Sequence, residues 1–156
     1  MSRQGHVFQI NISHGGVPKH PIREAEVTRL GIVGDHQNDT EHHGGPERAL
    51  CLFSLERILA LQAEGHPIFP GSTGENITVV GLDWSQVTAG TRLQLGDEVL
   101  IEVTRHTTPC ATIRDSFVGG NYSRLSQKRH PGWSRVYARV LQPGRIRIGD
   151  AVRLLP

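Results

Sequence analysis

The chain has 156 residues, of which 37% are hydrophobic, with a mean hydropathy of -0.31 and a formal net charge of +2. These values fit a single soluble globular domain, and the weak, scattered positive charge favours a small anionic ligand over nucleic acid. Two cysteines are too few for a secreted disulfide scaffold, and no apolar run reaches the ~20 residues of a membrane-spanning helix or forms a signal-peptide core, so we expect a cytoplasmic protein.

The first part of the chain predicts strands separated by polar loops. Residues 7–12 alternate in polarity as a strand does, and a loop rich in glycine and proline follows at 13–19. Residues 24–30 predict a weaker strand. The segment 31–47 is long and polar, and irregular chain of this length inside a compact domain is usually functional or disordered.

A buried strand and a helix come next. Residues 49–53 are apolar, and Ser54 then has the character of a helix N-cap. Apolar residues at helical spacing predict a helix over 54–64, which Gly65 is placed to end. Residues 77–80 predict another strand.

Two similar segments follow, RLQLGDEVLIEV at 92–103 and RIRIGDAVRLLP at 145–156. Aliphatic residues alternate on both sides of each Gly-Asp pair, which predicts two β-hairpins, and the glycine can supply the positive φ of a type II′ turn. Residues 135–141 predict a further strand, followed by a turn at 142–144.

This series of elements predicts a mostly β protein. We count about seven to nine short strands and one or two short helices. An antiparallel β-barrel closes so many short strands without leaving bare edges. No linker or shift in composition divides the chain, so we expect one domain over residues 1–156.

The two cysteines stand in different sequence contexts. Cys110 follows a strand and Pro109 at an expected helix start, with Arg114 one turn further on. Amides at a helix start and nearby cations favour a thiolate, so this cysteine could be a nucleophile or a metal ligand, although an inert buried cysteine is as common. Cys51 lies between two leucines and is expected to be an inert core residue.

Two adjacent histidines, His42 and His43, precede Gly44 and Gly45. They could bind a metal, one could act as a general base toward a catalytic cysteine, or they could donate hydrogen bonds to an anion held by the glycine amides. They could also be loop histidines without a function. The side chains that could complete a metal site are Asp35, His36 and Asp39.

Lys19 ends a glycine-rich loop, and a solvated lysine is the simplest interpretation. Since a loop lysine contributes little to packing, we expect that reversing its charge leaves the thermal midpoint nearly unchanged. The tripeptide Gly74-Glu75-Asn76 precedes a strand and could be a plain turn.

Six segments together resemble a MOSC domain, the module named for the C-terminal region of the molybdenum cofactor sulfurase. They are GGVPK at 15–19, GIVGD at 31–35, HHGGPERAL at 42–50, PGSTGENITVVGLD at 70–83, LGDEVLIEVTRHTTPC at 95–110 and GWSRVYARVLQPGRIRIGD at 132–150. They occur in the order and spacing of the family and cover nearly the whole chain. The resemblance, to the stand-alone bacterial type, implies an antiparallel β-barrel with a few helices.

The resemblance also implies a role for the molybdenum cofactor (molybdopterin), a pterin dithiolene with a terminal phosphate. Some relatives reduce N-hydroxylated compounds, with the family cysteine as molybdenum ligand, and others are thought to carry activated sulfur as a persulfide on that cysteine. This chain lacks iron–sulfur cysteines, so a reductase would need an external electron donor, and a sulfur carrier would need a sulfur donor protein. We expect a small-molecule substrate and no nucleic acid or membrane partner, and we leave open a homodimer.

Matched residue by residue, Cys110 corresponds to the family cysteine and is implied as the catalytic residue and metal ligand. The implied cofactor-binding residues are Lys19, His43, Gly44, Gly45, Asn76 and Arg114. Of these, Arg114 is the loosest match. A Cys–His hydrolase built on Cys110 and His43, and a metal-binding module built on the acidic and histidine side chains, are the remaining alternatives.

Overall fold

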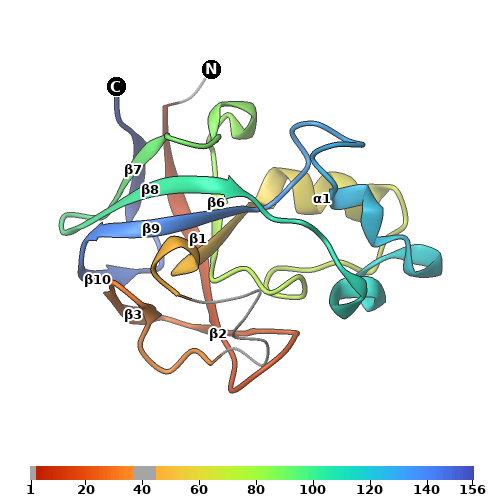
Figure 1. The fold of residues 1–156 in the computed structure, drawn as a ribbon, viewed down its shortest axis with the longest axis horizontal. Coiled ribbons are helices and arrows are strands. Elements are labelled where there is room, and N and C mark those ends of the chain that lie inside the picture. The colour runs from red at the N-terminus through yellow and green to blue at the C-terminus, as the bar shows by residue number, and fades with distance from the viewer. Residues whose placement is uncertain (1–2, 37–44) are drawn as a thin grey trace.

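Seven strands close a barrel in the computed structural model, which describes residues 3–36 and 45–156 (Figure 1). Around the ring the order is β11, β7, β8, β9, β5, β6 and β1, and β11 pairs back onto β1. Only β5 and β6 are parallel, so the predicted antiparallel barrel is confirmed. The strands are β1 (Gln4–Ile12), β5 (Leu50–Ser54), β6 (Ile77–Val80), β7 (Arg92–Leu95), β8 (Val99–His106), β9 (Val136–Gln142) and β11 (Ala151–Leu154).

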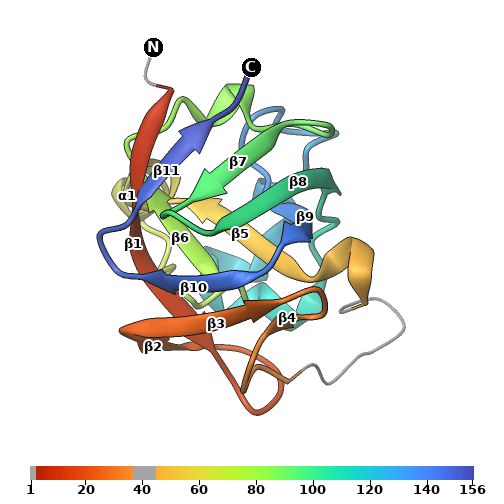
Figure 2. The ribbon, with the colours of Figure 1, turned by 90° about the vertical axis from the view of Figure 1, so that its left-hand side faces the viewer.

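A second, three-stranded sheet lies beside the barrel, with β10 and β3 below the barrel strands in Figure 2. It consists of β10 (Gly144–Arg147), β3 (Glu24–Thr28) and β4 (Gly31–Ile32), while β2 (His20–Ile22) pairs with β1. The described residues therefore form eleven strands, more than the seven to nine predicted. The sequence pattern missed β2 and β4 because two or three residues are too few to show a period.

The core of the barrel is filled by one face of each strand. Along β9, Val136, Ala138 and Val140 are buried in the core cluster, whereas Tyr137 lies on the opposite face because successive side chains alternate. Cys51 on β5 pairs with Tyr137, so both side chains are on the outer side of the barrel wall, although both are buried.

The predicted helix is confirmed as α1 (Leu55–Ala63). Ser54 is its N-cap, and the Ser54 Oγ accepts a hydrogen bond of 3.2 Å from the backbone N–H of Arg57. Leu55, Ile58 and Leu61 form its buried face. No helix in the described ranges is long and apolar enough to cross a membrane.

The two Gly-Asp segments do not form two hairpins. The hairpin between β7 and β8 is confirmed, but three residues connect the strands, so the two-residue type II′ turn is wrong. The second hairpin is also wrong, because β10 pairs with β3 while β11 pairs with β7 and β1. Instead the two turns meet: Gly96 N donates to Ala151 O at 2.8 Å, and a Cβ on Gly96 would lie 2.7 Å from Asp150 Oδ2.

Short 3-10 helices connect β8 to β9 and pack against α1. Arg124 donates two hydrogen bonds to the Glu64 carboxylate, at 3.0 and 2.7 Å, and its guanidinium carbon lies 4.2 Å from the centroid of the Trp133 ring. The guanidinium carbon of Arg57, from α1, lies 4.6 Å from the same centroid. The 3-10 helices are η1 (Pro46–Arg48), η2 (Trp84–Gln86), η3 (Ala111–Ser116), η4 (Val118–Gly120) and η5 (Tyr122–Leu125).

Candidate functional site

Most of the sequence motifs come together around Leu52 of β5. Leu52 pairs with Ile77, the first residue of β6, and with Val136, the first residue of β9. Strand β1 ends beside the start of β6, and β8 ends beside the start of β9. The loops 13–19, 70–76 and 107–110 leave or enter these strand ends. In both ribbon views this region lies away from the two termini (Figures 1 and 2).

The 70–76 loop joins the other segments of this region. It forms hydrogen bonds with three of them. The pairs are Lys19 N to Gly71 O at 2.9 Å, Ser116 Oγ to Ser72 Oγ at 2.9 Å, and the Arg135 guanidinium to Thr73 O. Gly71 is required here, because its φ is +89° and a Cβ would lie 2.6 Å from Lys19 O. The loop is therefore a structural centre of the site.

Lys19 is buried and forms an ion pair with Asp35. The distance from Lys19 Nζ to Asp35 Oδ2 is 2.6 Å, and the two side chains are 4% and 5% exposed. Asp35 also accepts hydrogen bonds from Ser13 N at 3.0 Å and from Asn76 Nδ2 at 2.8 Å. The interpretation of Lys19 as a solvated loop lysine is wrong, because its charge lies in the interior and depends on a partner 16 residues away. The expectation that reversing this charge leaves the thermal midpoint nearly unchanged loses its basis for the same reason.

Asn76 is a buried connection between strands rather than part of a plain turn. Its Oδ1 accepts from Cys51 N at 3.0 Å, and its Nδ2 donates to Asp35. Its backbone N–H donates to Cys51 O at 2.8 Å, while its carbonyl accepts from Asn11 N at 2.7 Å. Asn76 thus links β5, β1 and the carboxylate that holds Lys19.

Glu75 completes the group of buried polar side chains. It is fully buried, and the hydroxyls of Thr73 and Thr78 donate to its two oxygens at 3.0 and 3.2 Å. Burial raises the pKa of the Glu75 carboxyl, and hydrogen bonds and the Arg135 guanidinium oppose this effect. We call Lys19, Asp35, Glu75 and Asn76 the buried polar cluster.

Cys51 lies beside this cluster and has no exposed thiol. Burial raises the pKa of Cys51 to about 11. Its neighbour Tyr137 is also covered, and burial raises the pKa of the phenol to about 12, with Cys51 adding to the effect. The prediction that Cys51 is buried is confirmed, but Cys51 lies outside the barrel core, and its lack of reactivity stays a prediction.

Cys110 has the opposite environment. It is exposed and occupies the N-cap position of η3, where its side chain makes no capping hydrogen bond. The helix start was predicted correctly, but η3 is a six-residue 3-10 helix, so the dipole argument for an α-helix does not transfer. Arg114 of η3 is exposed, and burial lowers the pKa of His106 at the end of β8.

The structure describes only part of the segment that contains the two adjacent histidines. His42, His43, Gly44 and Asp39 lie outside the described residues, so their predicted roles stay predictions. Gly45 is described and leads into η1 with a φ of +82°. Among the residues that the structure does describe, no group of three or more histidine, cysteine or acidic side chains could hold a metal ion.

The donor groups around Cys110 fit an anionic cofactor with a soft metal. The exposed thiol offers a soft ligand, and Arg105 and Arg114 are exposed cations on either side of it in the chain. Thr107 Oγ1 and Arg135 Nε are buried and have no hydrogen-bond partner among the described residues. Buried polar groups without a hydrogen-bond partner are rare in native proteins, and these two fit a site where a ligand or a water molecule supplies the missing partner.

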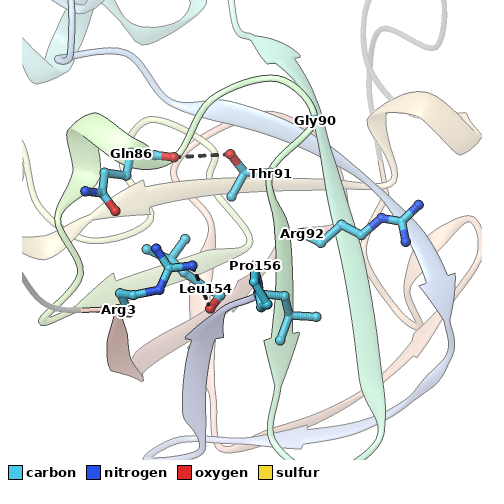
Figure 3. A pocket seen from close by; sticks show the side chains of 8 residues that line it. Arg3, Gln86, Gly90, Thr91, Arg92, Leu154 and Pro156 are labelled. Atoms are coloured by element: carbon cyan, nitrogen blue, oxygen red, sulfur yellow. Dashed lines mark hydrogen bonds between the residues drawn. The ribbon is translucent and has the colours of Figure 1, made fainter.

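A hollow of about 380 Å³ lies near the start of β1 and is shown in Figure 3. Arg3, Thr91 and Arg92 contribute its polar side, and Leu154 and Pro156 lie beside them. Among the residues that the structure describes, no cysteine, histidine or acidic side chain lines it. We therefore take the region that carries Cys110 as the candidate site.

Comparison with known proteins gives a family match and several relatives. The MOSC domain family model matches residues 39–153. The uncharacterised protein YflK of Bacillus subtilis is 31% identical over 142 residues, which cover 90% of this chain and 63% of that protein. The protein YiiM of Escherichia coli is 33% identical over 132 residues, covering 79% of this chain and 55% of that protein.

Two further similarities bear on activity and fold. A protein named reductase from Gibberella moniliformis is 31% identical over 130 residues, which cover 80% of this chain and 22% of that protein. The crystal structure of YiiM from Geobacillus stearothermophilus has a TM-score of 0.75 at 24% identity, covering 97% of this chain and 75% of that one, and at this identity it shows the fold alone. The chain spans less than two thirds of each of the three sequence relatives.

Proposed function

This chain belongs to the MOSC domain family, which is associated with the molybdenum cofactor, and we propose that it binds this cofactor in the region that carries Cys110. In this proposal Cys110 is the molybdenum ligand. The protein then acts as the component of an oxidoreductase that reduces N-hydroxylated small molecules. The named reductase among its relatives supports the redox role.

The exposure of Cys110 is the observation that carries the proposal. Of the two cysteines, only Cys110 presents its sulfur to a ligand, because Cys51 is buried and has a pKa of about 11. A metal ligand must be deprotonated and reachable, and a thiolate is the softest ligand that the chain offers. Cys110 meets the requirement of access, and Cys51 does not.

The other site residues divide into two groups by their surroundings. Arg114 is exposed near Cys110 and can meet an anionic cofactor, and His43, Gly44 and Gly45 are proposed to form one wall of the same site. Lys19 and Asn76 both donate to Asp35, so we propose that they hold the loops in place. When bound, the cofactor would supply a metal centre able to exchange electrons and oxygen with a substrate.

We propose that a separate donor protein supplies the electrons. The two cysteines of this chain, one of them buried, are too few to bind an iron–sulfur cluster through four thiolates. The protein would accept a small-molecule substrate at the exposed side of Cys110 and receive electrons from that partner.

A sulfur carrier is the second candidate function. The same exposed and uncapped thiol can hold a persulfide without a metal, with the outer sulfur supplied by a sulfur donor protein. The two functions differ in what is bound to the purified protein.

Elemental analysis of protein from cells that make the cofactor tests both functions. We expect molybdenum near one atom per chain in the parent and in Cys51→Ala, and little molybdenum in Cys110→Ser, because a hydroxyl is a harder and less acidic ligand. Cyanide-labile sulfur without molybdenum would support the sulfur carrier instead. Equal molybdenum in the parent and in Cys110→Ser would contradict the assignment of the ligand.

A further inference from the structure

Two arginines flank Tyr137 on the outer face of the barrel. The guanidinium carbons of Arg48 and Arg105 each lie 5.8 Å from the centroid of the Tyr137 ring. Arg48 comes from η1 and Arg105 from β8, so two separate elements bring positive charge to one aromatic ring. We call these three residues the arginine pair site.

A β-bulge places Arg105 at this position. The pairing of β8 with β9 shifts register between Val103 and Arg105, so that Thr104 is an extra residue on β8. In an unbroken strand Arg105 would share the buried face of Val103, but it is exposed instead. Bulges commonly turn a side chain toward a functional site, and this one turns a charged side chain out of the core.

The bulge also fixes the second arginine. Thr104 Oγ1 donates a hydrogen bond of 2.7 Å to the backbone carbonyl of Glu47, the residue before Arg48. The bulge at Thr104 therefore positions both Arg105 and the backbone next to Arg48. The Glu47 carboxylate forms its ion pair with Arg139, at 2.7 Å.

Four arginines on the strands, Arg92, Arg139, Arg145 and Arg147, are paired with carboxylates. Arg92 lies 2.9 Å from Glu102, and Arg139 is 3.2 Å from the same carboxylate. Arg145 and Arg147 share Glu24. In contrast, no carboxylate among the residues described lies within 4.0 Å of the Arg105 guanidinium. The strand surface thus leaves positive charge uncompensated near the cysteine loop.

We propose that Arg105 and Arg48 bind the carboxylate or phosphate group of a small-molecule ligand beside the Tyr137 ring. A guanidinium offers parallel N–H groups that match an oxyanion, and an aromatic face holds the guanidinium without using those donors. This site is independent of metal binding by Cys110. The oxyanion belongs either to a substrate or to the terminal phosphate of a bound cofactor.

The test uses the full chain without cofactor and titrates it with inorganic phosphate and with acetate, with acetamide as the uncharged control. Binding is followed by the ¹⁵N–¹H signal of the Arg105 side chain and by calorimetry. We expect saturable binding of at least one oxyanion and none of acetamide. Arg105→Gln should weaken binding by about tenfold or more, as expected for the loss of a charge-assisted hydrogen bond. The matched control Arg92→Gln, on the neighbouring strand, should change it by less than about twofold.

Two results would overturn this site: no saturable binding of either oxyanion, or equal affinities in the parent and in Arg105→Gln. Repeating the titration with cofactor-loaded protein separates the two sources of the oxyanion. If the loaded protein no longer binds phosphate, the cofactor's phosphate fills the site, and if it still binds, the site serves a substrate. Cys110→Ser should keep the affinity for phosphate, so that a failure of the metal proposal leaves this result unaffected.

Discussion

The buried polar cluster and the loop of Cys110 differ in how completely their polar groups are paired. Lys19 Nζ and Asn76 Nδ2 both donate hydrogen bonds to the Asp35 carboxylate, and each oxygen of Glu75 accepts a hydrogen bond from a threonine hydroxyl. The Cys110 thiol is exposed and makes no capping hydrogen bond. We infer that the two regions have different roles. The buried polar cluster fixes the positions of the loops, and the Cys110 loop presents its thiol to a ligand.

This difference in roles predicts opposite consequences of mutation in the two regions. Substitutions in the buried polar cluster should lower the free energy of unfolding, because they leave buried partners unsatisfied. Substitutions in the exposed loop should leave folding nearly unchanged and reduce ligand binding.

The largest expected effect follows from breaking the buried ion pair. Lys19→Ala leaves the Asp35 carboxylate without its cation in the interior, and we expect the free energy of unfolding to fall by about 3–5 kcal/mol. Lys128 is the other lysine of the chain and is exposed, so Lys128→Ala should change it by at most about 0.5 kcal/mol. Urea unfolding measures both.

A double variant sharpens this prediction. In Lys19→Met/Asp35→Asn both charges are removed while an amide oxygen can still accept from Ser13 N, so part of the lost stability should return. If Lys19→Ala unfolds at the same urea concentration as the parent, the ion pair does not stabilise the fold. The proposed structural role of the buried polar cluster would then be wrong.

The next effect concerns the amide that joins the strands. Asn76→Ala leaves the buried N–H of Cys51 and one hydrogen bond to Asp35 unsatisfied, and we expect a loss of roughly 2–3 kcal/mol. Asn121 is exposed and accepts only from a nearby serine, so Asn121→Ala is the control and should have little effect. Thermal unfolding of both variants measures the difference, and similar losses in the two would contradict the role given to Asn76.

The buried carboxyl of Glu75 predicts a pH dependence of stability. Because burial raises its pKa in the folded state, the folded state holds this proton more tightly than the unfolded state does. The contribution of Glu75 to stability is therefore largest at acidic pH and falls as the pH rises from the unfolded pKa through the folded pKa. The parent should lose stability relative to Glu75→Gln across this interval, as measured by unfolding at a series of pH values. A constant difference would contradict the shift.

The smallest effect on folding is expected at the exposed cysteine. Cys110→Ser should change the free energy of unfolding by no more than about 0.5 kcal/mol, since the thiol is in solvent. Cys51→Ser places a hydroxyl in a buried position and should cost about 1–3 kcal/mol. Denaturant unfolding of the two single variants compares the regions directly, and an equal cost for both would remove the contrast.

The sequence predicted those parts of the fold that local patterns determine. Alternating or continuous apolar residues identified β1, β5 and β6, and the N-cap Ser54 with its helical spacing identified α1. The Gly-Asp pairs identified two turns but not their partners. Whether β10 and β11 pair with each other depends on strands more than 100 residues away, and no local pattern contains this information.

The candidate site was less predictable, because burial of a charge depends on distant partners. Lys19 has the sequence context of a surface loop, and only Asp35 and Asn76 from other segments make its burial tolerable. The bulge at Thr104 was not visible either, since the alternation around it looks regular in the sequence. The identity of Asn76 as a connector could have been inferred from an amide placed directly before a buried strand, which is a weak signal.

Selective alkylation tests the central contrast between the two cysteines most directly. Protein without cofactor is treated with a limiting alkylating reagent at neutral pH, and the modified peptides are mapped. We expect Cys110 to be modified first and to be protected by bound molybdenum. Cys51 should react far more slowly, because burial raises its pKa to about 11. Preferential modification of Cys51, or equal labelling of Cys110 with and without bound molybdenum, would contradict the proposed roles of the two cysteines.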